Sequence, residues 1–158
     1  MSILKALNQL VGLVRVDPDV SIDDAKTLTE KCSQIAVAVA ATAGTDSAES
    51  GGIGLGKILV KRAILSQISG SDVSLNADNY ADVTLYATDG STDTTIATYT
   101  TKTADWTSHE GLEMTLTATV ANRTVAADQL LCAVVTKEGT GVATPAGLIS
   151  IAYEEVDA

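Results

Sequence analysis

The sequence predicts a mainly β protein, an antiparallel β-sandwich or barrel over residues 33–158 that follows a helical arm over residues 1–32. Three observations support this prediction. Apolar and polar residues alternate in several stretches after residue 80, as expected for half-buried strands. Turn sequences separate these stretches roughly every ten residues. No helical pattern lies between them, and this combination is typical of antiparallel sandwiches and barrels.

The arm begins with a short amphipathic helix over residues 2–16. Its apolar side chains recur three or four residues apart, and such a face needs a partner to cover it. The face consists of Ile3, Leu4, Leu7, Leu10, Val11 and Val14. Asp17-Pro18-Asp19 ends this helix, and Ser21 with Asp24 forms a capping-box pattern for a second helix that runs to about Lys31.

The strands of the β domain are predicted from residue 33 onwards. The first stretch, QIAVAVAATA, places Ile35, Val37 and Val39 on one side. KILVKRAILSQI (57–68) has no clear period, and its neighbours favour a strand. The later strands are YADVTLYAT (80–88), TIATYTT (95–101), GLEMTLTATV (111–120), DQLLCAVVTK (128–137) and GLISIAYEEV (147–156). The turn DGSTDT joins the first two of these later strands into a hairpin.

The alternation also predicts which side chains face the core. Val83, Leu85 and Ala87 share one face of their strand, and Val134 is expected inside. In GLEMTLTATV the predicted inner residues are Leu112, Met114, Leu116, Ala118 and Val120. With 46% hydrophobic residues but no Phe and a single Trp, the core must consist mainly of small aliphatic side chains.

Composition excludes some classes of function. The formal net charge of -10 would repel a phosphate backbone, so we expect no nucleic-acid partner. No apolar run approaches the ~20 residues of a membrane helix, and no signal sequence is recognisable, so a soluble protein is expected. Cys32 and Cys132 lie among apolar neighbours and are interpreted as buried free thiols.

The stretch GGIGLGKI (51–58) resembles a phosphate-binding loop. Gly51, Gly56 and Lys57 fit the pattern, but Ile58 stands where a hydroxyl group should reach magnesium. Such a loop also needs a helix that begins at its lysine, whereas an antiparallel strand is predicted there. We therefore interpret the glycines as a tight turn that leads into the first long strand and expect no nucleotide site.

Other candidate sites fail in similar ways. Residues 17–23 carry the alternating oxygen side chains of a calcium loop, but Ile22 stands where glycine is required and Leu28 where Glu is required. The single histidine, His109, excludes metal sites made of several histidines, and Asp105 and Ser108 lie too close to it in sequence to form a catalytic triad. We expect no enzyme activity, metal ion or cofactor. Trp106 is either a core residue or an interface anchor.

Three stretches resemble a known family: YADVTLYATDGST, LTATVANRTVAADQLLCAVV and KEGTGVATPAGLISIAYE. Together they are similar to the jelly-roll head decoration (cement) proteins of tailed bacteriophages, and the similarity covers about residues 50–154. Relatives of this kind have a Gly-Asp pair before the strand at residue 128, where this chain has Ala127-Asp128. Residues 1–49 match no known pattern.

The resemblance implies a jelly-roll sandwich that forms a homotrimer on the outer surface of a phage capsid, assembled in the host cytoplasm. There it would clamp neighbouring major capsid subunits and stabilise the lattice, with avidity compensating for weak single contacts. The expected binding residues are the apolar face of the arm and Trp106. The alternative is a tail-fibre or receptor-binding sandwich, which would need an aromatic-lined sugar groove.

Overall fold

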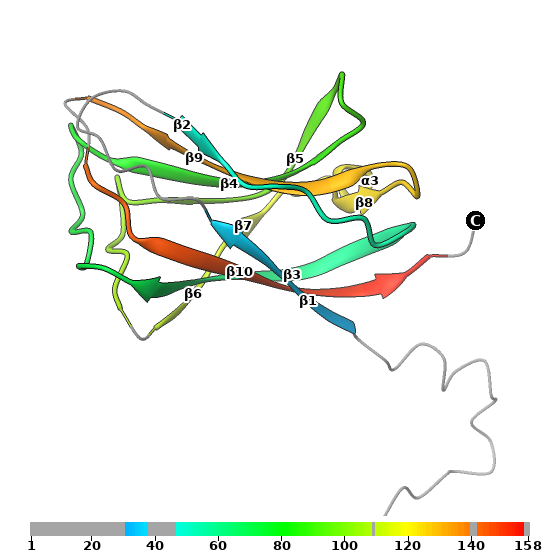
Figure 1. The fold of residues 1–158 in the computed structure, drawn as a ribbon, viewed down its shortest axis with the longest axis horizontal. Coiled ribbons are helices and arrows are strands. Elements are labelled where there is room, and N and C mark those ends of the chain that lie inside the picture. Colours follow the sequence, from blue (N-terminus) through cyan, green and yellow to red (C-terminus); the bar gives the residue numbers. More distant parts are fainter. Residues whose placement is uncertain (1–30, 38–46, 109, 140–141, 157–158) are drawn as a thin grey trace, which may run out of the picture.

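The computed structural model describes residues 31–37, 47–108, 110–139 and 142–156, and these residues form two antiparallel β-sheets. Figure 1 shows the sheets as two layers, with the ends of the described chain close together on the right. Sheet A has the order β1 (Lys31–Val37), β10 (Ala146–Glu155), β3 (Ile58–Ser69) and β6 (Gly111–Glu113), and β8 (Thr124–Val125) also pairs with β3. Sheet B has the order β2 (Ser47–Glu49), β9 (Leu130–Lys137), β4 (Ala81–Thr88), β5 (Asp93–Thr100) and β7 (Thr115–Leu116).

One apolar core fills the space between the two layers. It contains Ile35 and Val37 of β1, as predicted, whereas Val39 of the same predicted face lies outside the described residues. In β4, alternate residues from Ala81 to Ala87 are buried, as predicted, because successive side chains of a strand point to opposite faces. Most of the remaining core residues are Val, Ile, Leu and Ala. The predicted mainly β antiparallel fold is therefore correct.

The segment GLEMTLTATV differs from its prediction as one continuous strand. It forms β6, which pairs with β3 in sheet A, and β7, which pairs with β5 in sheet B. The chain crosses between the sheets at Met114, whose backbone N–H donates to Ala63 O at 2.9 Å. After Leu116 it leaves the sheets, so Ala118 is exposed and Val120 begins the short helix α3 (Val120–Arg123). The prediction that these two side chains face the core is wrong.

Two further predictions of burial need correction. Val134 is only partly buried, because the inward side of β9 carries Leu131, Ala133 and Val135 instead. Cys32 is exposed, because β1 is the edge strand of sheet A and Cys32 lies on its outward face. The second thiol, Cys132, is buried as predicted.

The predicted arm is described only at its end. Lys31 and Cys32 already belong to β1, so the first strand begins before the expected boundary at residue 33. The six apolar residues of the first predicted helix lie outside the described residues, as do the capping residues of the second predicted helix.

Candidate interaction surfaces

Three connections meet at the left-hand end of the molecule in Figure 1, and we call this the loop end. They are the β3–β4 connection (70–80), the β5–β6 connection (101–108 and 110) and the β9–β10 connection (138–139 and 142–145). Backbone N–H groups bind acidic side chains across the first two connections. Ser108 donates to Asp72 Oδ1 at 2.7 Å, and Leu75 donates to Asp105 Oδ1 at 2.6 Å. These hydrogen bonds hold the two connections together.

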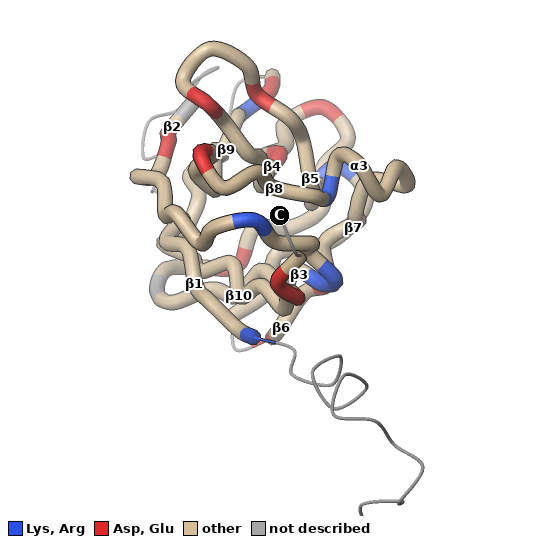
Figure 2. Tube along the Cα trace, turned by 90° about the vertical axis from the view of Figure 1, so that its right-hand side faces the viewer, with Lys and Arg blue, Asp and Glu red and all other residues tan. Residues whose placement is uncertain are grey.

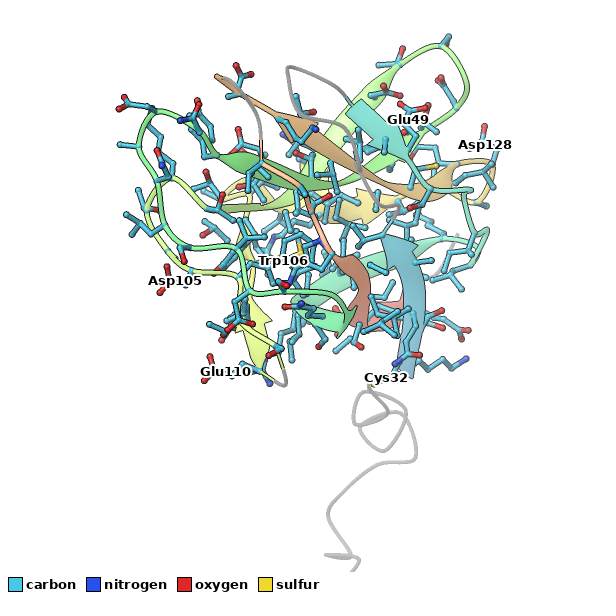
Figure 3. All side chains as sticks on the ribbon, turned by 60° about the vertical axis from the view of Figure 1, so that its left-hand side comes forward. Cys32, Glu49, Asp105, Trp106, Glu110 and Asp128 are labelled. Atoms are coloured by element: carbon cyan, nitrogen blue, oxygen red, sulfur yellow. The ribbon has the colours of Figure 1, made fainter. Side chains whose placement is uncertain are left out.

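The side chain of Trp106 is buried at the loop end. Its side chain is 0% exposed, and its backbone forms an antiparallel bridge with Val73 through two hydrogen bonds of 2.9 Å. Figure 3 shows the ring directed into the molecule, with Asp105 and Glu110 on the outside of the same connection. Of the two roles left open for Trp106, the burial selects that of a core residue. A role for Trp106 as an interface anchor stays a prediction that would require its ring to become exposed on binding.

A glycine makes room for the tryptophan ring. A Cβ atom on Gly147 would lie 2.9 Å from Trp106 Cζ2 and 3.0 Å from Ser66 O. Real Cβ atoms essentially never approach a neighbour more closely than 3.0 Å. The sequence alone showed only a glycine at the start of a strand, which is an ambiguous signal.

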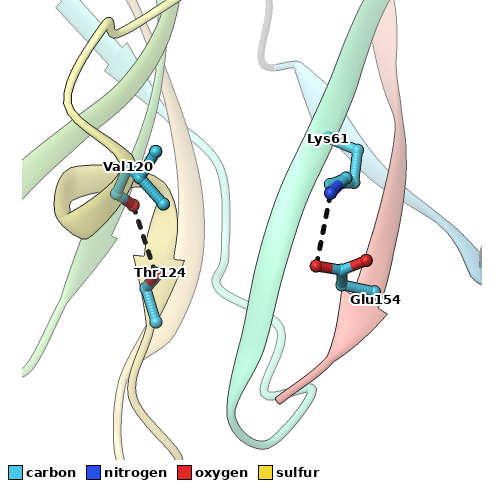
Figure 4. Close-up of polar contacts among 4 residues, drawn as sticks. All are labelled: Lys61, Val120, Thr124 and Glu154. Carbon is cyan, nitrogen blue, oxygen red and sulfur yellow. Dashed lines mark hydrogen bonds and ion pairs between the residues drawn. The ribbon is translucent and has the colours of Figure 1, made fainter. Parts of the chain in front are cut away.

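The opposite end of the molecule carries ion pairs between β10 and its neighbours. Lys31 pairs with Glu155, and Lys61 Nζ lies 3.3 Å from Glu154 Oε1. Figure 2 views this end directly, and Figure 4 shows the second pair bridging β3 and β10. All four side chains are more than a third exposed, so each pair contributes little to stability. Residues 1–30 connect to the described domain at this end, because they precede Lys31.

The outer face of sheet B carries a half-enclosed polar cluster. Tyr86 lies opposite Cys132 in the β4–β9 register, and its hydroxyl group donates to Glu49 Oε1 at 3.3 Å. Both residues of the pair are under 10% exposed. Burial raises the pKa of Tyr86 to about 12, with the charges of Cys132 and Glu49 acting in the same direction. Burial also raises the pKa of the Cys132 thiol, which makes this thiol a poor nucleophile.

The glycine-rich stretch that resembles a phosphate loop is an extension of β2 along β9. Ile53 N–H donates to Leu131 O at 2.9 Å and its carbonyl accepts from Leu131 N at the same distance. Gly52 has no side chain where a Cβ atom would lie 2.8 Å from Cys132 Sγ and 2.9 Å from Leu130 Cβ. Strand β3, not a helix, begins at Ile58. The interpretation of the stretch as a structural entry to the first long strand is consistent with this geometry.

The described residues contain no group of three or more His, Cys, Asp or Glu side chains that could hold a metal ion. Within the same residues, no helix has the length and apolar character needed to cross a membrane. Comparison of the chain with protein-family models, curated proteins and solved structures gives no match.

The aromatic side chains are buried or partly buried. Trp106, Tyr86 and Tyr153 are each at most 8% exposed. Tyr80 is partly buried beneath Lys102, whose Nζ lies 4.9 Å from the ring centroid. Tyr99 is partly buried and donates a hydrogen bond to Asp105 O. An aromatic-lined sugar groove would need exposed rings, so this arrangement does not favour a receptor-binding module.

Proposed function

We propose that this chain is a jelly-roll virion protein that binds the outer surface of a phage head as a homotrimer and stabilises the lattice of major capsid subunits. The observation that carries the proposal is the order in which strands pair. β1 pairs with β10, β2 with β9, β3 with β8 and β4 with β5. Nested antiparallel pairing of this kind is what a long hairpin gives when it is rolled into two sheets.

A rolled hairpin is the jelly-roll arrangement, which recurs in viral capsid and lectin domains. The pairings of β10 with β3 and of β9 with β4 complete the two sheets of such a roll. Together with the three sequence stretches that resemble head decoration proteins, this topology favours the capsid over other settings. A fold alone hosts many functions, so the proposal needs a test at the binding surface.

The proposed anchor is the apolar face of the first predicted helix (residues 2–16). This helix precedes β1, which begins at the end of the domain opposite the loop end. An isolated amphipathic helix of about 15 residues is marginal in water and gains stability when its apolar face docks. Each well-buried apolar side chain contributes about 1.5–3 kcal/mol before the cost of ordering is subtracted.

The test is binding of the purified protein to undecorated phage heads, followed by electron microscopy and co-sedimentation. We expect the intact chain to bind and the double variant Leu7→Asn, Leu10→Asn to lose binding while its thermal unfolding stays unchanged. Asn8→Ala, Gln9→Ala is the matched control, because these residues lie off the apolar face of the predicted helix. Full binding by a protein that lacks residues 1–30 would exclude the arm as the anchor.

The trimer is tested separately by sedimentation velocity on the intact and truncated proteins. A trimer in both would assign subunit contacts to the β domain. A trimer that becomes a monomer on truncation would assign those contacts to the arm. A monomer in both would contradict the proposed trimer in solution.

A further inference from the structure

The outer face of sheet A has balanced charges. Sheet A is the lower layer in Figure 1, and this face points away from sheet B. Three ion pairs join its strands: Lys31 with Glu155, Lys61 with Glu154 at 3.3 Å, and Arg62 with Glu113 at 3.4 Å. These pairs include every charged residue of β1, β3, β6, β8 and β10. The face is therefore neutral in a chain whose formal net charge is -10.

The other described surfaces are acidic. The strands of sheet B carry Glu49, Asp82 and Asp93, whereas the one basic residue of these strands, Lys137, is 1% exposed. The described connections of the loop end have one basic residue, Lys102, against the acidic residues Asp72, Asp78, Asp105, Glu110 and Glu138. Like charges closer than about 8 Å are only partly screened at physiological salt, so two copies that met through such surfaces would repel each other.

The middle of the sheet A face is uncharged and partly apolar. Ile64 and Leu148 are half-buried, and their chain neighbours Leu65 and Ile149 are buried in the core, so strand alternation places the first two on the outside. The register aligns one row of small or apolar residues across four strands: Ala36, Leu148, Ser66 and Gly111. Small side chains allow another surface to approach this row closely.

We propose that copies of this chain contact one another through the outer face of sheet A. The inference locates the subunit contact of the proposed homotrimer, so it rests on the self-association in that proposal but not on capsid binding. A second copy fits the face because it brings the same small apolar residues and the same balanced charges. The ion pairs are more than a third exposed and border the uncharged middle, as the polar rim of an interface does.

The first experiment compares the intact protein with Ala36→Glu by sedimentation velocity over a series of concentrations. Ala36 is exposed, so the substitution should leave thermal unfolding nearly unchanged. A carboxylate added to each copy inside the contact should weaken association by at least about tenfold, because like charges brought together in an interface are costly. Thr98→Glu, at an exposed position of β5 in sheet B, adds the same charge outside the contact and should leave association unchanged.

The second measurement uses the intact protein alone. Cys32 is exposed and lies opposite Ala152 in the β1–β10 register, whereas Cys132 is buried. Alkylation of Cys32 by iodoacetamide should be fast in dilute protein. It should slow in proportion to the associated fraction as the concentration rises. As a control, Thr98→Cys in a Cys32→Ser background should react at the same rate at every concentration.

The outcomes separate this contact from other occupants of the face. Equal association of Ala36→Glu and the intact protein would overturn the proposal, as would a Cys32 that reacts equally fast in associated protein. Protection of Cys32 in dilute, monomeric protein would assign the face to residues 1–30, and protection only in the presence of phage heads would assign it to the capsid; both results would also overturn the proposal. Loss of head binding does not enter these measurements, so a failure of the capsid proposal is seen separately.

Discussion

Replacement of Trp106 by alanine tests whether this residue serves the core or a partner. The side chain is 0% exposed, and its ring lies against Gly147 at the junction of the three connections of the loop end. Truncation of a buried Phe or Trp to Ala typically costs about 3–5 kcal/mol through lost apolar burial and the cavity that remains. The two backbone hydrogen bonds to Val73 do not involve the side chain, so the expected loss of stability comes from removal of the ring.

The magnitude can be measured by urea denaturation. We expect the midpoint to fall by an amount that corresponds to about 3–5 kcal/mol at an unchanged slope, since the slope reports the surface exposed on unfolding. For a domain of this size the same loss lowers the melting temperature by about 2–4 °C per kcal/mol. Leu75→Ala is the matched control. Leu75 lies on the β3–β4 connection of the same end, but its side chain is 50% exposed, so its replacement should change stability by no more than about 0.5 kcal/mol.

The opposite pattern would refute the reasoning. If Trp106→Ala unfolds within about 1 kcal/mol of the intact protein but no longer binds phage heads, the ring is an anchor that becomes exposed on binding. If stability falls and binding at low temperature persists, the ring belongs to the core alone. The two outcomes are separated by measuring binding well below the melting temperature of the variant.

Three further predictions concern packing and protonation. Leu65→Ala should cost about 2–5 kcal/mol, and Leu116→Ala should cost clearly less by the same denaturation assay, because Leu65 is 0% exposed and Leu116 only partly buried; equal losses would mean that β7 is packed more deeply than described. Gly52→Val should cost about 1–3 kcal/mol, because its Cβ atom would meet Cys132 Sγ at 2.8 Å, and an unchanged melting temperature would contradict that close approach. Absorbance titration should show Tyr86 ionising at about pH 12, a phase that Tyr86→Phe removes; since its pKa is raised on folding, the stabilising contribution is complete below the pKa of free tyrosine and is lost as the pH rises towards 12.

The strands could be predicted where one face is buried and the other is solvated. Alternation predicted β4 and its inward residues, because apolar residues recur at every second position of ADVTLYAT. The same pattern misled the prediction in GLEMTLTATV. Alternation shows that a segment is extended, but it does not show which sheet accepts its hydrogen bonds. The crossing at Met114 depends on β3 and β5, which come earlier in the chain.

The facing of β9 could not be read from its sequence. LLCAVV is a continuous apolar run, so either face of the strand presents apolar side chains. The sequence therefore does not show whether Val134 points into the core or away from it. The exposure of Cys32 has a different cause. Whether a strand lies at the edge of a sheet depends on its partners, and the sequence of β1 contains no information on that point.

The loop end was the part least accessible to sequence reasoning. Asp72 with Ser108 and Asp105 with Leu75 are joined across more than 25 residues, and no short pattern marks such pairs. Lysine at the end of a strand is ordinarily solvated, so Lys137 gave no signal of its burial. Its burial follows from its position on the inward side of β9 beneath the β9–β10 connection.

The two ends of the domain therefore differ in how they respond to change. At the loop end, the buried Trp106 and Lys137 make stability sensitive to single substitutions, and the hydrogen bonds of Asp72 and Asp105 restrict the surface connections. At the opposite end, exposed ion pairs contribute little, and residues 1–30 join the domain through Lys31. Under the proposed function, this separation would leave the packing of the closed end intact when the attachment surface changes. Substitutions at the two ends should accordingly have additive effects on stability, since they share no partner.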